Sequence, residues 1–333
     1  MSIFLDFDGT ITTEDTVTHL ANFALRFQSS RQSPDAGRSV DGPQDTSLSG
    51  TEDPSRAGDE QTQEQDKTKK GYLSSRWDDV VRAYVSDYKS HASSYAPRAE
   101  DRQHADDEIA FLRSQKHVER NSLERINACA LFRGIGPDAF REAGRELVRD
   151  GTVRLRPGFD RFVRAALEKG WHVSVVSVNW SAAFIEGACG FSEEDVAVFA
   201  NEVREHDGAV LGPGALVGDG LLASEGGEDL SSERASRNLT NSCDKHDAVR
   251  EVMRKRDTQD KPFFYFGDST TDMECLLAAT RGVVIADDET SSLIKTLRRI
   301  GKRVPHVRDA EASEELVWAA NFEEVMRSTL DLL

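Results

Sequence analysis

The sequence predicts an α/β protein with a Rossmann-like, doubly wound parallel sheet as its core and an inserted all-helical cap domain. Short apolar runs rich in β-branched and aromatic residues recur at 2–5, 171–176 and 262–266, with amphipathic helical patterns between them. The first and last of these runs end in carboxylates and a glycine turn. Between the first two runs the apolar spacing is helical. A chain of 333 residues has room for such a core and a smaller second module.

The opening strand ends in Asp6-Phe7-Asp8-Gly9-Thr10. Side chains two apart on an extended strand point the same way, so Asp6 and Asp8 are expected to project together from its carboxyl end, where open α/β sheets bind ligands. Two carboxylates about 4 Å apart repel each other by roughly 4 kcal/mol at an effective dielectric constant near 20. The pair therefore indicates a hard cation with oxygen ligands, such as Mg²⁺.

Residues 15–155 are expected to form the cap, and residues 1–14 and 156–333 the core. Apolar spacing predicts helices over 15–27, around 77–88, over 104–130, and from Gly136-Pro137 to about 148. Residues 28–71 carry hardly any large apolar side chain, which predicts a disordered surface insertion.

The core is expected to resume with a helix after Pro157, a strand over 171–176 that ends at Ser177, a helix over 182–188 and a strand over 196–200. Asp207-Gly208 between two valines predicts a hairpin. The Gly-, Ser- and Glu-rich residues 218–242 predict a mobile loop, after which Lys245 opens a helix.

A second acidic cluster follows the strand at 262–266. Gly267 supplies the turn, and Asp268 and Asp272 are four residues apart at an expected helix start, which places both on one face of its first turn. A further strand over 283–286 ends in Asp287 and Asp288 near the same sheet edge, where capping of the next helix at Thr290 is the favoured role.

In their order and strand context, 6–10, Ser177, Lys245 and 267–272 resemble the four motifs of the haloacid dehalogenase superfamily of hydrolases. The helical cap between the first two motifs resembles the phosphoserine phosphatase branch. This resemblance implies a phosphomonoesterase in which Asp6 is the nucleophile that forms an aspartyl-phosphate and Asp8 is the general acid/base. It also implies Mg²⁺ held by Asp6, the Asp8 carbonyl and Asp268, with Asp272 orienting its water ligands. The implied phosphate ligands are Thr10, Ser177, Val178 and Lys245.

The cap should determine the substrate, because it would close over the part of the ligand beyond the phosphate. The branch acts on phosphoserine, phosphoethanolamine or phosphocholine, methionine-salvage sugar phosphates and pyridoxal phosphate. Its phosphoserine phosphatases carry a glutamate near the position of Asp15, whereas the opening here resembles methionine-salvage phosphatases more closely. Asp15 could bind a cation of the substrate, but capping of the following helix is the preferred role.

Several alternatives stay open. Dehalogenation is disfavoured, because dehalogenases of this superfamily lack the acid corresponding to Asp8. Phosphotransfer to a second substrate, as in a mutase, uses the same chemistry. A regulatory protein that keeps the fold has no physical need for clustered carboxylates, and a protein phosphatase would be obstructed by a large cap.

The composition excludes several functional classes. A formal net charge of −17 disfavours binding to nucleic acid or an anionic membrane. The sequence has no apolar run long enough to span a bilayer and no basic-then-apolar leader, which predicts a soluble, cytoplasmic protein whose partner is a small phosphorylated metabolite. Neither a zinc site nor a disulfide framework is expected from four scattered cysteines: Cys129, Cys189, Cys243 and Cys275.

Overall fold

The computed structural model describes residues 1–30, 55–192, 194–216 and 237–328, with the backbone alone over 55–72. Six parallel strands form one sheet in the order β3-β2-β1-β6-β7-β8. The strands are β1 (Ser2–Leu5), β2 (His172–Val176), β3 (Val196–Phe199), β6 (Phe263–Gly267), β7 (Arg281–Ile285) and β8 (Leu316–Ala319). From β1 the chain proceeds outward to β2 and β3, then returns to β6 on the other side of β1. The predicted doubly wound α/β core is confirmed, and its topological switch point lies between β1 and β6.

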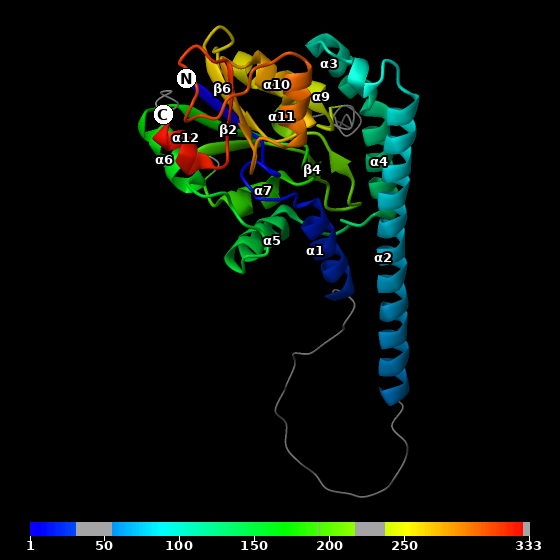
Figure 1. Cartoon of the computed structure of the whole chain (residues 1–333). Coiled ribbons are helices and arrows are strands. Elements are labelled where there is room, and N and C mark those ends of the chain that lie inside the picture. Colours follow the sequence, from blue (N-terminus) through cyan, green and yellow to red (C-terminus); the bar gives the residue numbers. More distant parts are fainter. Residues whose placement is uncertain (31–54, 193, 217–236, 329–333) are drawn as a thin grey trace, which may run out of the picture.

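Both faces of the sheet are covered, and its strands are accordingly largely apolar. Leu5 and Phe266 belong to one buried cluster, which includes residues of α6 (Phe159–Glu168), α7 (Ala182–Cys189) and α12 (Phe322–Arg327). Phe4 and Tyr265 belong to the opposite cluster, with residues of α9 (Ser242–Lys255), α10 (Met273–Ala278) and α11 (Ser292–Arg299). This alternation follows the two-residue period of a strand. Figure 1 shows the helices on both sides of the sheet.

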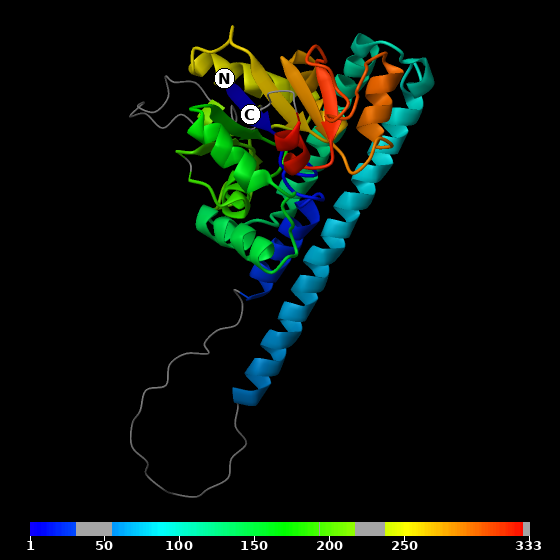
Figure 2. The same ribbon diagram turned by 60° about the vertical axis from the view of Figure 1, so that its left-hand side comes forward.

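The regular secondary structure described between residues 15 and 155 consists of helices alone. These are α1 (Val17–Ser30), α2 (Ser55–Ser94), the 3₁₀ turn η1 (Ala99–Asp101), α3 (Ala105–Ser114), α4 (Lys116–Cys129) and α5 (Pro137–Arg149). The prediction of a single helix over 104–130 is wrong. The helix is interrupted at Gln115, which is the C-cap of α3 and the N-cap of α4. Figures 1 and 2 show that α2 is much longer than the other helices and that its N-terminal end extends past α1.

Disorder was expected over 28–71. Residues 31–54 of this range lie outside the described residues. The expectation is wrong for 28–30, which form the end of α1, and for 55–71, which belong to α2. Gln, Glu, Lys and Arg are good helix formers, so a segment too polar to build a core can still be helical. Of the expected loop over 218–242, residues up to 236 are likewise outside the description, and α9 begins at Ser242.

Two contacts attach the helical segment firmly to the core. Helices α5 and α7 approach through Gly144 and Gly187, where added Cβ atoms would lie 2.3 Å and 2.0 Å from backbone oxygens. At the far end, Glu108 of α3 accepts hydrogen bonds at 2.7 Å from Arg102 and from Arg299 of α11. The segment is therefore anchored at both ends.

The core also contains a short hairpin and elements that were not predicted from the sequence. The hairpin predicted at Asp207-Gly208 is confirmed as β4 (Glu202–Val203) paired with β5 (Val210–Leu211). The sequence analysis did not predict β8 or α12, and of α11 it predicted only a helix start near Thr290. Among the described helices, none has the length and apolar character needed to cross a membrane.

Candidate active site

Three carboxylates meet at the carboxyl ends of β1 and β6. One oxygen from each of Asp6, Asp268 and Asp272 lies within 4.8 Å of the others. Asp6 directly follows β1 and Asp268 directly follows β6, and the Asp6 N–H donates to the Phe266 carbonyl at 2.9 Å. Because the strands are parallel neighbours, their ends bring the two acids together across 262 positions of sequence.

Lys245, in the first turn of α9, lies fully buried between two of these acids. Its Nζ is 2.6 Å from Asp6 Oδ1 and 2.7 Å from Asp272 Oδ1. Burial by itself lowers the pKa of Lys245, but Asp272 and Asp6 together raise it above the ordinary value. The lysine therefore stays charged and offsets part of the negative charge in the cluster.

Asp272 is held rigidly by groups around its carboxylate. Oδ1 accepts from the Tyr265 hydroxyl at 2.7 Å as well as from Lys245, and Oδ2 accepts the backbone N–H groups of Asp268 and Ser269 at 3.2 Å and 3.1 Å. Tyr265 is a site residue that the sequence analysis missed, since it lies inside a strand of apolar aromatics. The only available signal was its hydroxyl, which needs a partner when buried.

Burial and mutual repulsion act on the other two acids. Burial, followed by the Asp272 charge, raises the pKa of Asp6 well above its usual range and the pKa of Asp268 to about 7. One lysine cannot neutralise three carboxylates, so the cluster carries excess negative charge. Its donors are all oxygens, the set that Mg²⁺ and similar hard cations bind. These residues therefore fit a divalent cation.

Gly9 and Thr10 support Asp268 from the loop after β1. Thr10 Oγ1 donates to Asp268 Oδ1 at 3.2 Å. Gly9 has φ +76°, and a Cβ there would lie 2.2 Å from Asp268 Oδ2. Arg156, buried and missed by the sequence analysis, donates to the Gly9 carbonyl at 3.0 Å and pairs with Asp287 at 2.7 Å.

Asp8 does not join the three-carboxylate cluster. Its Oδ1 accepts the N–H and the hydroxyl of Thr16 at 2.8 Å and 2.6 Å, and its Oδ2 accepts the Asn179 side-chain amide at 2.8 Å. The expectation that Asp6 and Asp8 project together is wrong for a simple reason: β1 ends at Leu5, so the strand period does not extend to them. Burial, and to a smaller extent the negative charge of Asp15, raises the pKa of Asp8, which favours its protonated form.

Ser177 and Val178 follow β2 beside Asp8. The fully buried Ser177 accepts the Asn179 N–H at 3.2 Å through its Oγ. Asn179 therefore links the residues after β2 to the Asp8 carboxylate. Asn179 and Thr16 were both missed, because isolated polar residues in loops carry no pattern of their own.

Farther along the sheet edge, Asp288 accepts the Thr290 N–H at 2.6 Å in a local turn. The N-cap of α11 is Ser291, whose side chain accepts the Ile294 N–H at 3.2 Å, so the expected capping of that helix by Asp287 or Asp288 is wrong. Asp287 pairs with Arg156 instead.

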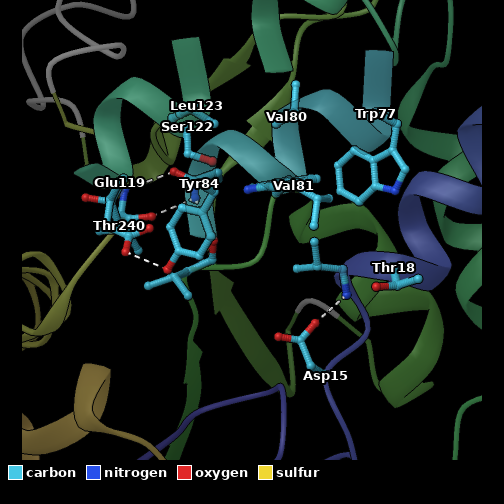
Figure 3. Close-up of a pocket in the computed structure, with 15 residues that line it drawn as sticks. Asp15, Thr18, Trp77, Val80, Val81, Tyr84, Glu119, Ser122, Leu123 and Thr240 are labelled. Atoms are coloured by element: carbon cyan, nitrogen blue, oxygen red, sulfur yellow. Dashed lines mark hydrogen bonds between the residues drawn. The ribbon is translucent and has the colours of Figure 1, made fainter. Parts of the chain in front are cut away.

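A cavity of about 370 Å³ is lined in part by sequence neighbours of Thr16 and Asn179, the two residues that hold Asp8. Figure 3 shows the side chains of its walls. Its walls come from α2 and α4 and from the loops after β1 and β2, and they include Asp15, Trp77, Tyr84, Glu119, Val178 and Trp180. The carboxylate of Asp15 accepts the Val17 N–H at 2.7 Å, so it turns the chain into α1 as expected, and it also borders the cavity.

Comparison with known proteins gives a family. A model described as haloacid dehalogenase-like hydrolase matches residues 89–277, more than half of the chain. A search of curated proteins finds no significant match.

Among solved structures, the chain is similar to a substrate-bound phosphoserine phosphatase complex, with 10% identity, a TM-score of 0.42 and coverage of 98% of this chain and 96% of that chain. It is also similar to a phosphoserine phosphohydrolase-like protein from Francisella tularensis subsp. tularensis SCHU S4, with 13% identity, a TM-score of 0.44 and coverage of 98% of this chain and 97% of that chain. A third similar structure is cytosolic 5'-nucleotidase IIIB bound to cytidine, with 14% identity, a TM-score of 0.44 and coverage of 100% of this chain and 85% of that chain. Such low identities and TM-scores give no information about the substrate.

Proposed function

Because the chain belongs to the haloacid dehalogenase-like hydrolases, we propose that it is a Mg²⁺-dependent phosphomonoesterase of small phosphorylated metabolites in the cytoplasm. The proposal rests on one observation: a buried cluster of Asp6, Asp268 and Asp272 with Lys245 lies beside a separately held Asp8. That arrangement would supply a nucleophile that is also a cation ligand, and a proton donor whose carboxyl is held by separate residues.

Asp6 is the nucleophile of this proposal. One of its carboxylate oxygens attacks phosphorus, the bond from phosphorus to the leaving oxygen breaks, and an aspartyl-phosphate forms. A carboxylate is a weak nucleophile toward a phosphate dianion because both are negative, so the reaction depends on positioning and on neutralisation of charge. Lys245, 2.6 Å from Asp6, supplies a permanent positive charge at this position.

Asp8 is the general acid and then the general base. Its raised pKa favours the protonated carboxyl that must give a proton to the leaving oxygen. The resulting carboxylate takes a proton from the water that attacks the aspartyl-phosphate, which releases inorganic phosphate and restores Asp6. Thr16 and Asn179 keep the Asp8 carboxyl oriented through both steps.

The cation would be held by Asp6, Asp268 and the Asp8 carbonyl, with Asp272 orienting water ligands. When bound, it neutralises charge on the phosphoryl oxygens. Lys245 and Tyr265 keep Asp272 in place. Ser177, Thr10 and Val178 complete the phosphate site, where the Ser177 hydroxyl donates to a phosphoryl oxygen.

The test is hydrolysis of para-nitrophenyl phosphate with Mg²⁺, with and without a chelator. Wild type is expected to be active only with the metal, and Asp6→Asn to be inactive while remaining folded. Asp138→Asn, an exposed acid in the first turn of α5, is the matched control and should behave as wild type. Equal rates for wild type and Asp6→Asn would refute the assignment.

A further inference from the structure

The cavity beside Asp8 is placed to receive the leaving group. Val178 and Trp180 in its wall flank Asn179, whose amide donates to Asp8 at 2.8 Å. On the other side, Asp15 precedes Thr16, which also donates to Asp8. Asp8 is the proposed proton donor to the leaving oxygen, and the residues beside its two hydrogen-bond partners line this cavity, so this is where we place the group attached to that oxygen. The inference below therefore rests on the phosphomonoesterase function proposed above.

The walls of the cavity are largely apolar and aromatic. Trp77 of α2 and Trp180 meet edge to face, with ring centroids 5.9 Å apart, and Val80, Leu123 and Leu239 add aliphatic surface. Figure 3 shows Trp77, Val80 and Val81 along one side and Tyr84 with Glu119 on the other. A leaving group that fills this space must bury apolar surface, which a polyol offers only in small amounts.

Two carboxylates border the same space without a cation. Glu119 of α4 accepts the Tyr84 hydroxyl at 2.9 Å, which orients it, and Asp15 lies at the start of α1. The cavity lining contains no lysine, arginine or histidine, and no ion pair joins Glu119 or Asp15 to a basic residue in the described parts of the chain. Burial raises the pKa of Glu119, as expected for a carboxylate that lacks a charged partner.

A positive charge on the ligand would pair with Glu119, which is partly buried, and would be attracted by Asp15, which is exposed at the edge of the cavity. We propose that the leaving group of the substrate is an alcohol or phenol that combines an apolar body with a positively charged amine, selected by Glu119 and Asp15. The aromatic walls favour the same charge, because ring faces attract cations. A carboxylate or second phosphate on the leaving group would meet two acids and, among the residues that the structure describes, no base, so zwitterionic and bisphosphate substrates are disfavoured.

Three aryl phosphates with similar leaving oxygens test the charge alone. They are 4-ethylphenyl phosphate, which is neutral beyond the phosphate, O-phosphotyramine, which adds an amine, and O-phosphotyrosine, which adds both an amine and a carboxylate. Wild type should hydrolyse O-phosphotyramine with a kcat/KM about tenfold above that of 4-ethylphenyl phosphate, the scale of a cation held by rings and a carboxylate. O-phosphotyrosine should be poorer than O-phosphotyramine.

Glu119→Gln should abolish most of this preference. The matched control is Glu124→Gln, one turn farther along α4, where the side chain is exposed and pairs only loosely with Arg120 at 3.8 Å. The control should keep the wild-type ratio. A ratio that is unchanged in Glu119→Gln, or a wild type that prefers the neutral or zwitterionic ester, would overturn the inference.

Calorimetric titration of the products needs no turnover. Tyramine should bind wild type about tenfold more tightly than 4-ethylphenol, and Glu119→Gln should remove the difference. Equal affinities in wild type would refute the cation selection even if hydrolysis is normal. Conversely, a wild type that hydrolyses none of the esters but still selects tyramine would refute the phosphatase function and leave the cation site established.

Discussion

Gly9→Ala should disable the site without removing any of its carboxylates. Gly9 lies in the loop after β1 with φ +76°, and a Cβ there would be 2.2 Å from Asp268 Oδ2 and 2.5 Å from Asp268 Cγ. Both atoms belong to the carboxyl group that the cation site needs. Because real Cβ contacts are essentially never this short, the Asp268 carboxyl or the loop that carries residue 9 must shift, and either movement disturbs the cluster.

The change has two separable costs. An alanine held at positive φ loses roughly 1–2 kcal/mol of stability through backbone strain alone. Displacement of Asp268 should also weaken binding of the cation. A ligand present at a hundred times its Kd stabilises the folded state by about 2.7 kcal/mol, and the variant should lose this stabilisation. Activity toward para-nitrophenyl phosphate should fall at least about a hundredfold, the scale of a single lost electrostatic group in a transition state.

Gly301→Ala is the matched control. Gly301 has φ +82° and no atom within 4 Å of the added Cβ, so this variant carries the same backbone strain without a clash. Chemical unfolding with and without Mg²⁺, together with hydrolysis rates, separates the two costs. Gly301→Ala should lose a little stability but keep its activity and its Mg²⁺ stabilisation. If Gly9→Ala also kept both, the close approach of Gly9 to Asp268 would not matter and the proposed cation site would be refuted.

Three further variants test other parts of the structure. Lys245→Met leaves two buried carboxylates without their cation and should cost about 3–5 kcal/mol in the free energy of unfolding, measured without Mg²⁺; a loss below 1 kcal/mol would contradict the buried ion pair. Glu108→Gln leaves two arginines facing a neutral amide at the α3–α11 contact and should likewise lower the free energy of unfolding by about 3–5 kcal/mol. Hydrolysis should be unchanged at a temperature where the variant is folded. Gly187→Ala should destabilise more than Gly190→Ala in thermal unfolding, because its Cβ would lie 2.0 Å from a backbone oxygen of α5 whereas Gly190 has open space; the reverse order would contradict the close α5–α7 packing.

The strands that build the sheet could be predicted where their own residues carry the pattern. β1, β2 and β6 are short apolar runs that end in turn residues or hydroxyls, and their carboxyl ends carry Asp6, Ser177 and Asp268. β8 was missed because Leu316–Ala319 is a run of four residues with no motif after it. The strand order needed the structure, since the adjacency of β1 and β6 depends on the return crossover rather than on any local signal.

The prediction for Asp6 and Asp8 shows where a local rule stops applying. The two-residue period holds within a strand, yet β1 ends at Leu5 and the chain turns immediately afterwards. Asp8 is consequently held by Thr16 and Asn179, neither of which a strand pattern could indicate. This separation matters for the proposed chemistry, because an acid inside the cluster would be drawn to a cation, whereas Asp8 would keep the proton that the proposal gives to the leaving oxygen.

The cavity proposed to hold the leaving group could not be predicted from the sequence for a related reason. Trp77, Glu119 and Trp180 lie in three segments, on α2, on α4 and after β2, and each fits an ordinary amphipathic or loop pattern on its own. Only the packing of α2 and α4 against the loop after β2 brings the two tryptophans within 5.9 Å of each other. The catalytic groups follow strand ends and so repeat a pattern that a sequence can display. The groups proposed to select the substrate come from helices and a loop that meet only in the folded chain, so their combined chemistry becomes visible only once those segments are in place.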